Sequence, residues 1–452
     1  MQNPVTEKWQ SDDAAKGVPA GFKLTEVGVI PEDWDCVEID SLISEISMGP
    51  FGSDIKVSNF VSEGVPVLNG VNVSTERLSD TFTNFVTESK AKSLKKAVAH
   101  RGDVVVTHRG TIGQISYIPE NSIYTKYVIS QSQFRVKFKP LVIPSWITSY
   151  FLSDEGAEKL LEGKGHTGVP ALSAPTTTFR KLKVPLPSLG EQITINRVLL
   201  DIDIFIAEME NLITKKQAIK TATMQQLLTG KTRLPQFALR EDGTVKGYKN
   251  SELGEIPEDW EVSNLGNIAK IQRGASPRPI DSPIWFKQNS SVGWLRISDV
   301  TKTSKYLTET TQNLSELGIA SSRFVPSNSL VMSICATVGK PIITNKDICI
   351  HDGFVVFNYL NINQNYMYYI LKDLEDEWMK EGQTGSQMNL NTRLINNRFI
   401  IFPNDNHEQT AIAAIFSDMD QEIQTLQQRL EKTRQIKQGM MQELLTGKTR
   451  LI

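Results

Sequence analysis

The chain has 452 residues, 39% of them hydrophobic and 22% charged, and its formal net charge is −2. This composition is ordinary for a globular protein, and the length favours more than one domain. The three cysteines form no Cys-x-x-Cys pair, which excludes a disulfide framework and a cysteine zinc site and fits a reducing cytoplasm. Neither an apolar run of about 18 residues nor an N-terminal apolar core occurs, so we expect no membrane span and no signal peptide.

Two sequence boxes each occur twice along the chain. Gly28-Val-Ile-Pro-Glu-Asp-Trp34 returns as Gly254-Glu-Ile-Pro-Glu-Asp-Trp260, and Leu227-Leu-Thr-Gly-Lys-Thr-Arg-Leu234 returns as Leu444-Leu-Thr-Gly-Lys-Thr-Arg-Leu451. The offsets are 226 residues (28 to 254) and 217 residues (227 to 444). Such a period is far longer than the roughly 20–50 residues of a solenoid repeat. We therefore predict one domain-sized unit duplicated in tandem, with an internal pseudo-twofold relation between the copies.

In chain order, residues 1–20 form a polar arm and residues 21–187 a first globular domain rich in short strand signals. The strand signal at Asp103–Thr107 runs into a turn of small residues with Thr111 and Gly113. Its counterpart in the second copy is Ser329–Ser333, followed by Thr337 and Gly339. An amphipathic helix is expected near Ser145–Glu162, and another near Gln364–Lys380.

Between these shared anchors the two copies diverge. The first copy has Gly49-Pro-Phe-Gly-Ser-Asp-Ile-Lys56 where the second has Arg273-Gly-Ala-Ser-Pro-Arg278. A common frame that carries different loops is what two recognition specificities need, because binding residues concentrate on loops held by a rigid scaffold.

A long helix is predicted to close each copy, within residues 188–234 and 405–452. Ser188 and Glu191 have the spacing of a capping box, as do Asp405 and Glu408, and the glycine of each Thr-Gly-Lys stops the helix. About 38 residues without a breaker favour a coiled coil over a helix packed only on its own domain. The seam consists of apolar residues spaced by three and four, at equivalent places in both helices: Leu199, Ile202, Ile206, Met209, Ile213, Phe416, Met419, Ile423, Leu426 and Leu430.

Residues 235–404 provide a linker and the second globular domain. The fold class is therefore α+β, with two similar globular domains joined by two long antiparallel coiled-coil helices. No motif in the chain supports catalysis. The repeated Gly-Lys-Thr lacks the first glycine of a phosphate-binding loop and ends a helix instead of beginning one. Gly163-Lys-Gly-His-Thr-Gly168 has the spacing Gly-x-Gly-x-x-Gly, but it follows the helix expected near Ser145–Glu162 instead of a strand, so it is not a dinucleotide-binding loop. GxSxG and HExxH are absent, as is the Asp/Asn-Pro-Pro-aromatic tetrapeptide of amino-methylating enzymes, so we expect no catalytic residue, no metal and no cofactor.

Three motifs together resemble type I restriction-modification specificity subunits, over Gly21 to Leu451. They are the Ile-Pro-Glu-Asp-Trp box, Pro-Leu-Pro-Ser-Leu-Gly-Glu-Gln from Pro185 to Gln192, and the Leu-Leu-Thr-Gly-Lys-Thr-Arg-Leu motif. The second copy departs at Pro403–Glu408, where the second proline is missing.

This resemblance implies two target recognition domains, 21–187 and 235–404, which read a bipartite, asymmetric site on double-stranded DNA. It also implies a complex with two methyltransferase subunits and with motor-nuclease subunits. S-adenosylmethionine, ATP and Mg would belong to those partners.

Candidate DNA contacts are basic residues in or beside the divergent loops, because phosphate and guanine-edge contacts come from such side chains. They are Lys56, His108, Arg109 and Lys126 in the first copy, and Arg273, Arg278, Arg296 and Lys340 in the second. A solvated or ion-paired surface charge is the alternative for each. Amides that could read adenine are Asn69, Asn72, Gln131 and Gln133. His166 and His351 are expected to be structural.

Two other classes of function stay open at this point. The chain could be a self-sufficient DNA methyltransferase or nuclease with an unrecognised site, or a coiled-coil scaffold whose domains bind protein. The missing motifs argue against the first class, and salt-dependent binding to duplex DNA would argue against the second.

Overall fold

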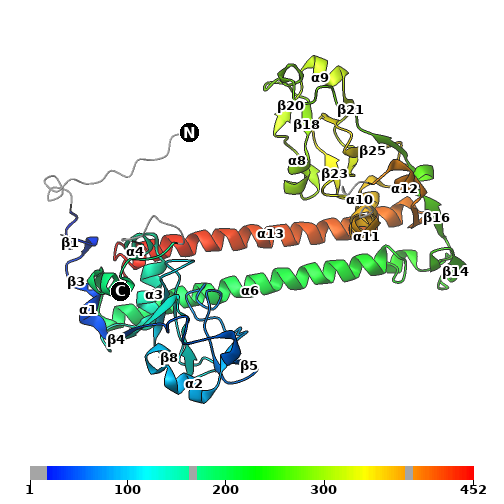
Figure 1. Ribbon diagram of the computed structural model, residues 1–452. Coiled ribbons are helices and arrows are strands. Elements are labelled where there is room, and N and C mark those ends of the chain that lie inside the picture. Colours follow the sequence, from blue (N-terminus) through cyan, green and yellow to red (C-terminus); the bar gives the residue numbers. More distant parts are fainter. Residues whose placement is uncertain (1–17, 162–169, 382–389, 452) are drawn as a thin grey trace. The chain divides into compact units, whose positions relative to one another are not determined.

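A computed structural model of the protein describes residues 18–161, 170–381 and 390–451 (Figure 1). Most of the predicted polar arm and His166 lie outside these ranges. The chain forms two compact units, Met1–Glu210 with Gln428–Ile452, and Asn211–Gln427. Among the described residues, no helix is long and apolar enough to cross a membrane.

The first unit is built on a four-stranded antiparallel sheet with the order β10-β9-β12-β4. The expected strand near Asp103 is β9, whose three valines are fully buried and therefore leave no polar face. The strands of this sheet are β4 (Ile43–Met48), β9 (Val104–Thr107), β10 (Ile115–Tyr117) and β12 (Gln133–Phe138). A core that includes Trp34, Phe134 and Trp146 packs with this sheet.

The second unit repeats this sheet in the order β23-β22-β25-β17, with β19 added beside β23. These strands are β17 (Lys270–Arg273), β19 (Tyr306–Leu307), β22 (Leu330–Ser333), β23 (Pro341–Thr344) and β25 (Phe354–Asn358). The matching strand order confirms that the sequence repeat is a structural repeat.

Smaller paired strands are also shared between the copies. In the first unit they are β1 (Phe22–Thr25) with β2 (Gly28–Pro31), and β3 (Asp35–Glu38) with β13 (Lys183–Leu186). In the second they are β14 (Tyr248–Ser251) with β15 (Gly254–Pro257), and β16 (Trp260–Asn264) with β26 (Phe399–Pro403). Each repeated Ile-Pro-Glu-Asp-Trp box therefore begins in a strand of a hairpin.

The remaining strands form a second layer in each unit. The first unit has a three-stranded sheet, β5-β7-β6, and a pair, β8 with β11. These strands are β5 (Phe60–Val61), β6 (Val65–Pro66), β7 (Phe85–Val86), β8 (Val98–His100) and β11 (Lys126–Val128). The second unit has one four-stranded sheet, β20-β18-β24-β21. These strands are β18 (Gly293–Leu295), β20 (Gln312–Asn313), β21 (Arg323–Val325) and β24 (Ile348–Ile350). The pairing is nevertheless the same in both: the chain after β6 runs parallel to β11 at the bridge Val67–Val128, as β18 does to β24, and β8 and β21 are their antiparallel neighbours. The second layer is therefore also part of the repeat, with β5 added in the first unit.

The predicted amphipathic helices are each two helices. The first is divided into α3 (Pro144–Leu152) and α4 (Asp154–Leu160), because Ser153 is extended and its hydroxyl caps α4 by accepting from the backbone N–H of Gly156. The second is divided into α10 (Gln364–Asp373) and α11 (Glu375–Glu381). Shorter helices are α1 (Ile39–Leu42), α2 (Glu88–Ser93), α5 (Pro175–Lys181), α7 (Leu265–Ile268), α8 (Ile297–Lys302), α9 (Glu316–Ala320) and α12 (Thr392–Asn397).

The two long helices are α6 (Leu189–Leu227) and α13 (Asn406–Leu444), of 39 residues each (Figure 1). The first unit holds the start of α6 and the end of α13, with Nζ of Lys437 2.6 Å from the Asp203 carboxylate. The second holds the end of α6 and the start of α13, with Nζ of Lys220 2.5 Å from Asp420. Within each unit the helices therefore run antiparallel, which confirms the predicted coiled coil.

The predicted seam lies on the less exposed side of these helices. Leu199, Met209, Ile213, Phe416, Ile423 and Leu430 are buried, whereas Ile202, Ile206, Met419 and Leu426 are half-buried. Burial at spacings of three and four is what an apolar coiled-coil stripe produces.

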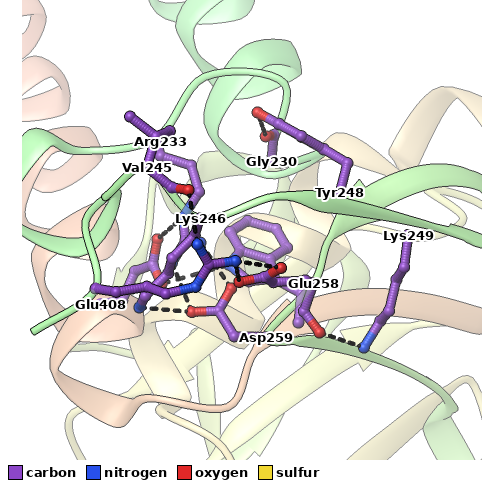
Figure 2. A network of polar contacts seen from close by, with 11 residues as sticks. Gly230, Arg233, Val245, Lys246, Tyr248, Lys249, Glu258, Asp259 and Glu408 are labelled. Atoms are coloured by element: carbon purple, nitrogen blue, oxygen red, sulfur yellow. Dashed lines mark hydrogen bonds and ion pairs between the residues drawn. The ribbon is translucent and has the colours of Figure 1, made fainter. Parts of the chain in front are cut away.

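In the second unit, the motif at the end of α6 docks on the Ile-Pro-Glu-Asp-Trp box, a contact that we call the clasp (Figure 2). Gly230 has φ +70°, and a Cβ there would lie 2.5 Å from Cδ of Pro257, so only glycine fits. Arg233 donates to the carboxylates of Asp259, at 2.6 and 3.1 Å, and of Glu408, at 2.9 and 2.6 Å. The repeated Gly-Lys-Thr therefore ends a helix, as predicted, and the arginine after it fixes the domain to the helices.

The first unit contains an equivalent clasp, made by the end of α13. Gly447 has φ +74° and lies against Pro31, and Arg450 donates to Asp33 at 2.8 and 3.0 Å and to Glu191 at 2.8 Å. The indole N–H of Trp34 donates to Glu191 at 2.9 Å. Only half of the predicted capping box exists, because the Glu191 carboxylate serves the clasp.

A buried lysine connects the second domain with α13. Nζ of Lys305 lies 3.0 Å from Oγ of Ser417 and 3.3 Å from the hydroxyl of Tyr369, and 4.5 Å from the centre of that ring. Burial lowers the pKa of Lys305 to about 8, although Asp420 acts in the opposite direction.

The lowered pKa predicts how stability changes with pH. Between pH 8 and the usual lysine value the unfolded chain binds more protons than the folded one, so the contribution of Lys305 to stability rises with pH. From pH 7.5 to 9.5 we expect the wild type to gain about 2 kcal/mol relative to Lys305→Met. Thermal unfolding at both pH values measures this gain, and parallel pH profiles for the two proteins would contradict it.

Candidate nucleic-acid interface

Three segments meet at one end of the main sheet in the first domain: the loop after β4, the turn between β9 and β10, and the residues before β12. The backbone N–H of Gly49 donates to the carbonyl of Gln133 at 2.8 Å, and that of His108 donates to Ser132 at 2.9 Å. A Cβ on Gly49 would lie 1.9 Å from the carbonyl oxygen of Ser130, so glycine is required where the divergent loop begins.

The second domain contains the same junction. Gly274 donates to the carbonyl of Phe354 at 2.9 Å, and Ile334 donates to Gly353 at 2.8 Å. A Cβ on Gly274 would lie 2.0 Å from the carbonyl oxygen of His351. These matching hydrogen bonds align the two domains residue by residue: Gln131 corresponds to Asp352, and Arg109 to Cys335.

In the first domain this junction borders a hollow of about 1160 Å³. Its lining includes four cationic side chains, all exposed: Lys92, Lys95, Lys96 and Arg109. Gln131 and the phenyl ring of Phe51, which is 82% exposed, also line it. A hollow with cations and an amide at its rim offers phosphate contacts together with a group that can read a base.

The other candidates of the first domain have varied surroundings. Lys56 is exposed, and its backbone N–H donates to the Asn59 side chain. His108 is half-buried with Nε2 3.3 Å from the Gln131 carbonyl oxygen, and burial lowers the pKa of its ring. Lys126 is ion-paired with Glu88 at 2.6 Å.

The structure also separates the four candidate amides. Gln133 and Asn72 are fully buried and hydrogen-bonded within the domain, and Asn69 is half-buried. Only Gln131 among these four is exposed. It is therefore the candidate amide that DNA can reach.

Of the candidates in the second domain, two lie at the junction. Nε of Arg273 donates to the backbone oxygen of Asp352 at 2.6 Å, and Nη2 of Arg278, which is 73% exposed, lies 3.7 Å from the Asp352 carboxylate. The other two are held by the domain itself. Nε of Arg296 donates to Gln312 at 2.8 Å, and Nζ of Lys340 donates to the backbone oxygen of Thr301 at 3.1 Å. Burial also lowers the pKa of Lys340.

Asp352 is the residue at this junction that sequence reasoning missed. Its Oδ1 accepts from the hydroxyl of Ser276 at 2.8 Å, and its side chain is 47% exposed. Burial opposes ionisation, but the hydrogen bond from Ser276 and the nearby cations hold the pKa of Asp352 below its usual value. An acidic side chain is not an expected phosphate contact, and only the backbone contacts of the fold show that Asp352 matches Gln131.

Comparison with known proteins gives a consistent result. The family described as type I restriction modification DNA specificity domain matches residues 31–221 and 257–435. The MjaVIII type I restriction enzyme specificity subunit of Methanocaldococcus jannaschii is 24% identical over 442 residues, which cover 93% of this chain and 94% of that protein.

Two solved structures show a similar fold. One is a chain of a type I restriction-modification system studied for complex assembly and conformational transition; it has a TM-score of 0.57 and 15% identity, over 93% of this chain and 99% of that one. The other is the S subunit from M. genitalium, with a TM-score of 0.51 and 14% identity, over 91% of this chain and 96% of that one.

Proposed function

This chain belongs to the type I restriction modification DNA specificity family, and from that premise we propose that each of its two globular domains reads one half of a bipartite, asymmetric DNA target. The observation that carries this proposal is the junction. Both domains build it from the same backbone contacts and then fill it with different side chains, as the pair Gln131 and Asp352 illustrates. Two frames with different reading surfaces are suited to two different half-sites.

We further propose that the subunit is not itself catalytic and that it carries no cofactor. Methyl transfer and DNA cleavage would belong to methyltransferase and motor-nuclease partners, which would hold S-adenosylmethionine, ATP and Mg. Support comes from the sequence, which contains no GxSxG, no HExxH and no Asp/Asn-Pro-Pro-aromatic tetrapeptide. Because both long helices occur as equivalent elements of a repeat, we expect two methyltransferase subunits in the complex.

The long helices are proposed to set the spacer between the half-sites. Each has 39 residues, or about 58 Å at 1.5 Å per residue. Proteins that read two half-sites fix their separation through such rigid connections.

Mapping of methylated bases tests this function. The full chain is expressed with its neighbouring methyltransferase, and modified positions are mapped by single-molecule sequencing. We expect one bipartite, asymmetric motif with a non-specific spacer. A contiguous or palindromic motif would contradict two independent readers, and methylation by the purified chain alone would identify a self-sufficient enzyme.

A further inference from the structure

We propose that Gln131 and Asp352, which hold the same position in the two domains, are specificity-determining residues that each read the edge of one base. This inference rests on the proposed function and adds to it which kind of base each of the two residues contacts. Gln131 is assigned to an adenine, and Asp352 to a base that presents an amino group, with cytosine as the preferred one.

The geometry favours this position over its neighbours. Both residues occur one place before the residue whose carbonyl accepts from the β9–β10 turn or its counterpart, Ser132 or Gly353. The backbone on either side is therefore fixed, whereas the side chains of Gln131 and Asp352 are exposed and half-buried, respectively. A side chain that projects from an ordered backbone reads a base without a large loss of conformational entropy.

Gln131 has the hydrogen-bonding groups that adenine requires. A primary amide donates through NH₂ and accepts through oxygen, which matches N7 and the N6 amino group of adenine in the major groove. The hollow beside it carries Lys92, Lys95, Lys96 and Arg109, whose charges suit the phosphates on either side of a base. Gln131 is thus an uncharged side chain that can contact a base, surrounded by cationic side chains that can contact phosphates.

Asp352 has the complementary chemistry, because an ionised carboxylate only accepts hydrogen bonds. Ser276 occupies Oδ1, whereas the Arg278 guanidinium lies 3.7 Å from Oδ2, beyond hydrogen-bonding distance. Oδ2 is therefore available to accept from N4 of cytosine, the pairing that acidic side chains make in the major groove.

A carboxylate near DNA must also be protected from repulsion by phosphates. Arg273 donates to the backbone oxygen of Asp352, and Arg323 donates through Nε to the backbone oxygen of Arg273 at 2.5 Å. Arg273 and Arg278 thus place two cations beside Asp352, and Arg323 holds the backbone of Arg273. The equivalent of Arg109 in this domain is Cys335, which is uncharged and directed to the Gly353 oxygen at 3.7 Å, so the cationic groups come from other positions.

The test measures base preference in the complete complex of the full chain and its methyltransferase, by methylation of a library of randomised half-sites. With Asp352→Asn we expect one position of one half-site to lose its preference by roughly tenfold to a hundredfold and to shift from cytosine to adenine. With Gln131→Glu we expect the reverse shift, from adenine to cytosine, in the other half-site. In each variant the unaffected half-site is the internal control.

Two further variants protect the test from effects on folding. Ser276→Ala keeps the carboxylate but removes its hydrogen bond, so we expect a smaller loss of preference at the same base pair as with Asp352→Asn. Asp376→Asn makes the same chemical change at an exposed position of α11, and we expect an unchanged motif. Thermal unfolding verifies that each variant is folded. If Asp352→Asn does not fold, the base preferences of Ser276→Ala and Gln131→Glu test the inference in its place.

The possible outcomes separate this inference from the proposed function. If the wild type yields no bipartite motif, the proposed function itself fails. If the motif is bipartite but folded Asp352→Asn and Gln131→Glu leave it unchanged, the inference is wrong and the function stands. A loss of methylation that is uniform over all sequences would assign these residues to positioning or phosphate contact, and would also overturn the inference.

Discussion

Replacement of Arg233 by alanine is expected to reduce the unfolding free energy of the second unit by about 3–5 kcal/mol, because it leaves a buried charge without its partner. The Arg233 side chain is 6% exposed and that of Glu408 is 1% exposed, at a closest distance of 2.6 Å. Burial raises the pKa of Glu408 even with Arg233 in contact, so the carboxylate depends on this cation for its ionised form. Hydrogen exchange measured by mass spectrometry would report the loss for each unit separately.

Arg450 provides the matched control in the first unit. It makes the same two ion pairs, but its side chain is 35% exposed, against 8% for Glu191, the counterpart of Glu408, and 62% for Asp33. Solvent reaches Arg450 and Asp33 and screens their charges, so Arg450→Ala is expected to cost the first unit only about 1–2 kcal/mol. Equal losses for the two variants would show that burial does not determine the strength of the clasp.

A second large effect is expected when both long helices are lengthened. Insertion of seven residues at equivalent exposed-face positions of α6 and α13 keeps the heptad register and adds about 10.5 Å to each helix. That length equals about three base pairs at 3.4 Å each. We therefore expect the original motif to lose methylation, because three base pairs also rotate one half-site around the duplex by about 100°.

Mapping of methylated bases again provides the measurement. Methylation that persists should occur at the same two half-sites with a longer spacer. Insertion into α6 alone is the control, since it shifts one helix against the other and should prevent assembly. A double-insertion variant that methylates the original motif at the original spacing would show that the helices do not set the spacer.

The features that the sequence predicts are those that leave a pattern in it, either a repeated motif or a regular spacing of apolar residues. Gly230 and Gly447 are recognisable as helix stops because a glycine directly after a long apolar period is typical of a helix C-terminus. The seam follows from its spacing of three and four residues, and the strand at Val104 from consecutive β-branched residues. In each case the signal lies in neighbouring residues, which is where local physical constraints act.

What the sequence did not predict depends on contacts between distant residues. The spacing of Ser188 and Glu191 indicated a capping box, yet Glu191 binds Arg450, 259 positions away. The division of α3 from α4 at Ser153 was also missed, because a continuous apolar pattern hides a cap in its interior. At the candidate DNA interface, Asp352 is recognised only from the backbone contacts that give it the same position in its domain as Gln131 has in the other.

The clasp has a consequence for the order in which the protein is made. Arg450 lies 417 positions after its partner Asp33, whereas Arg233 lies 26 positions from Asp259. At about 5–20 residues per second, a ribosome needs roughly 20–80 s between these two distant residues. The domain that emerges first is therefore completed last. Its Trp34 lacks its contact with the end of α13 until the whole second copy has been synthesised. During that interval the apolar surface of the first domain that α13 later covers is exposed, and there the nascent chain would need protection from aggregation.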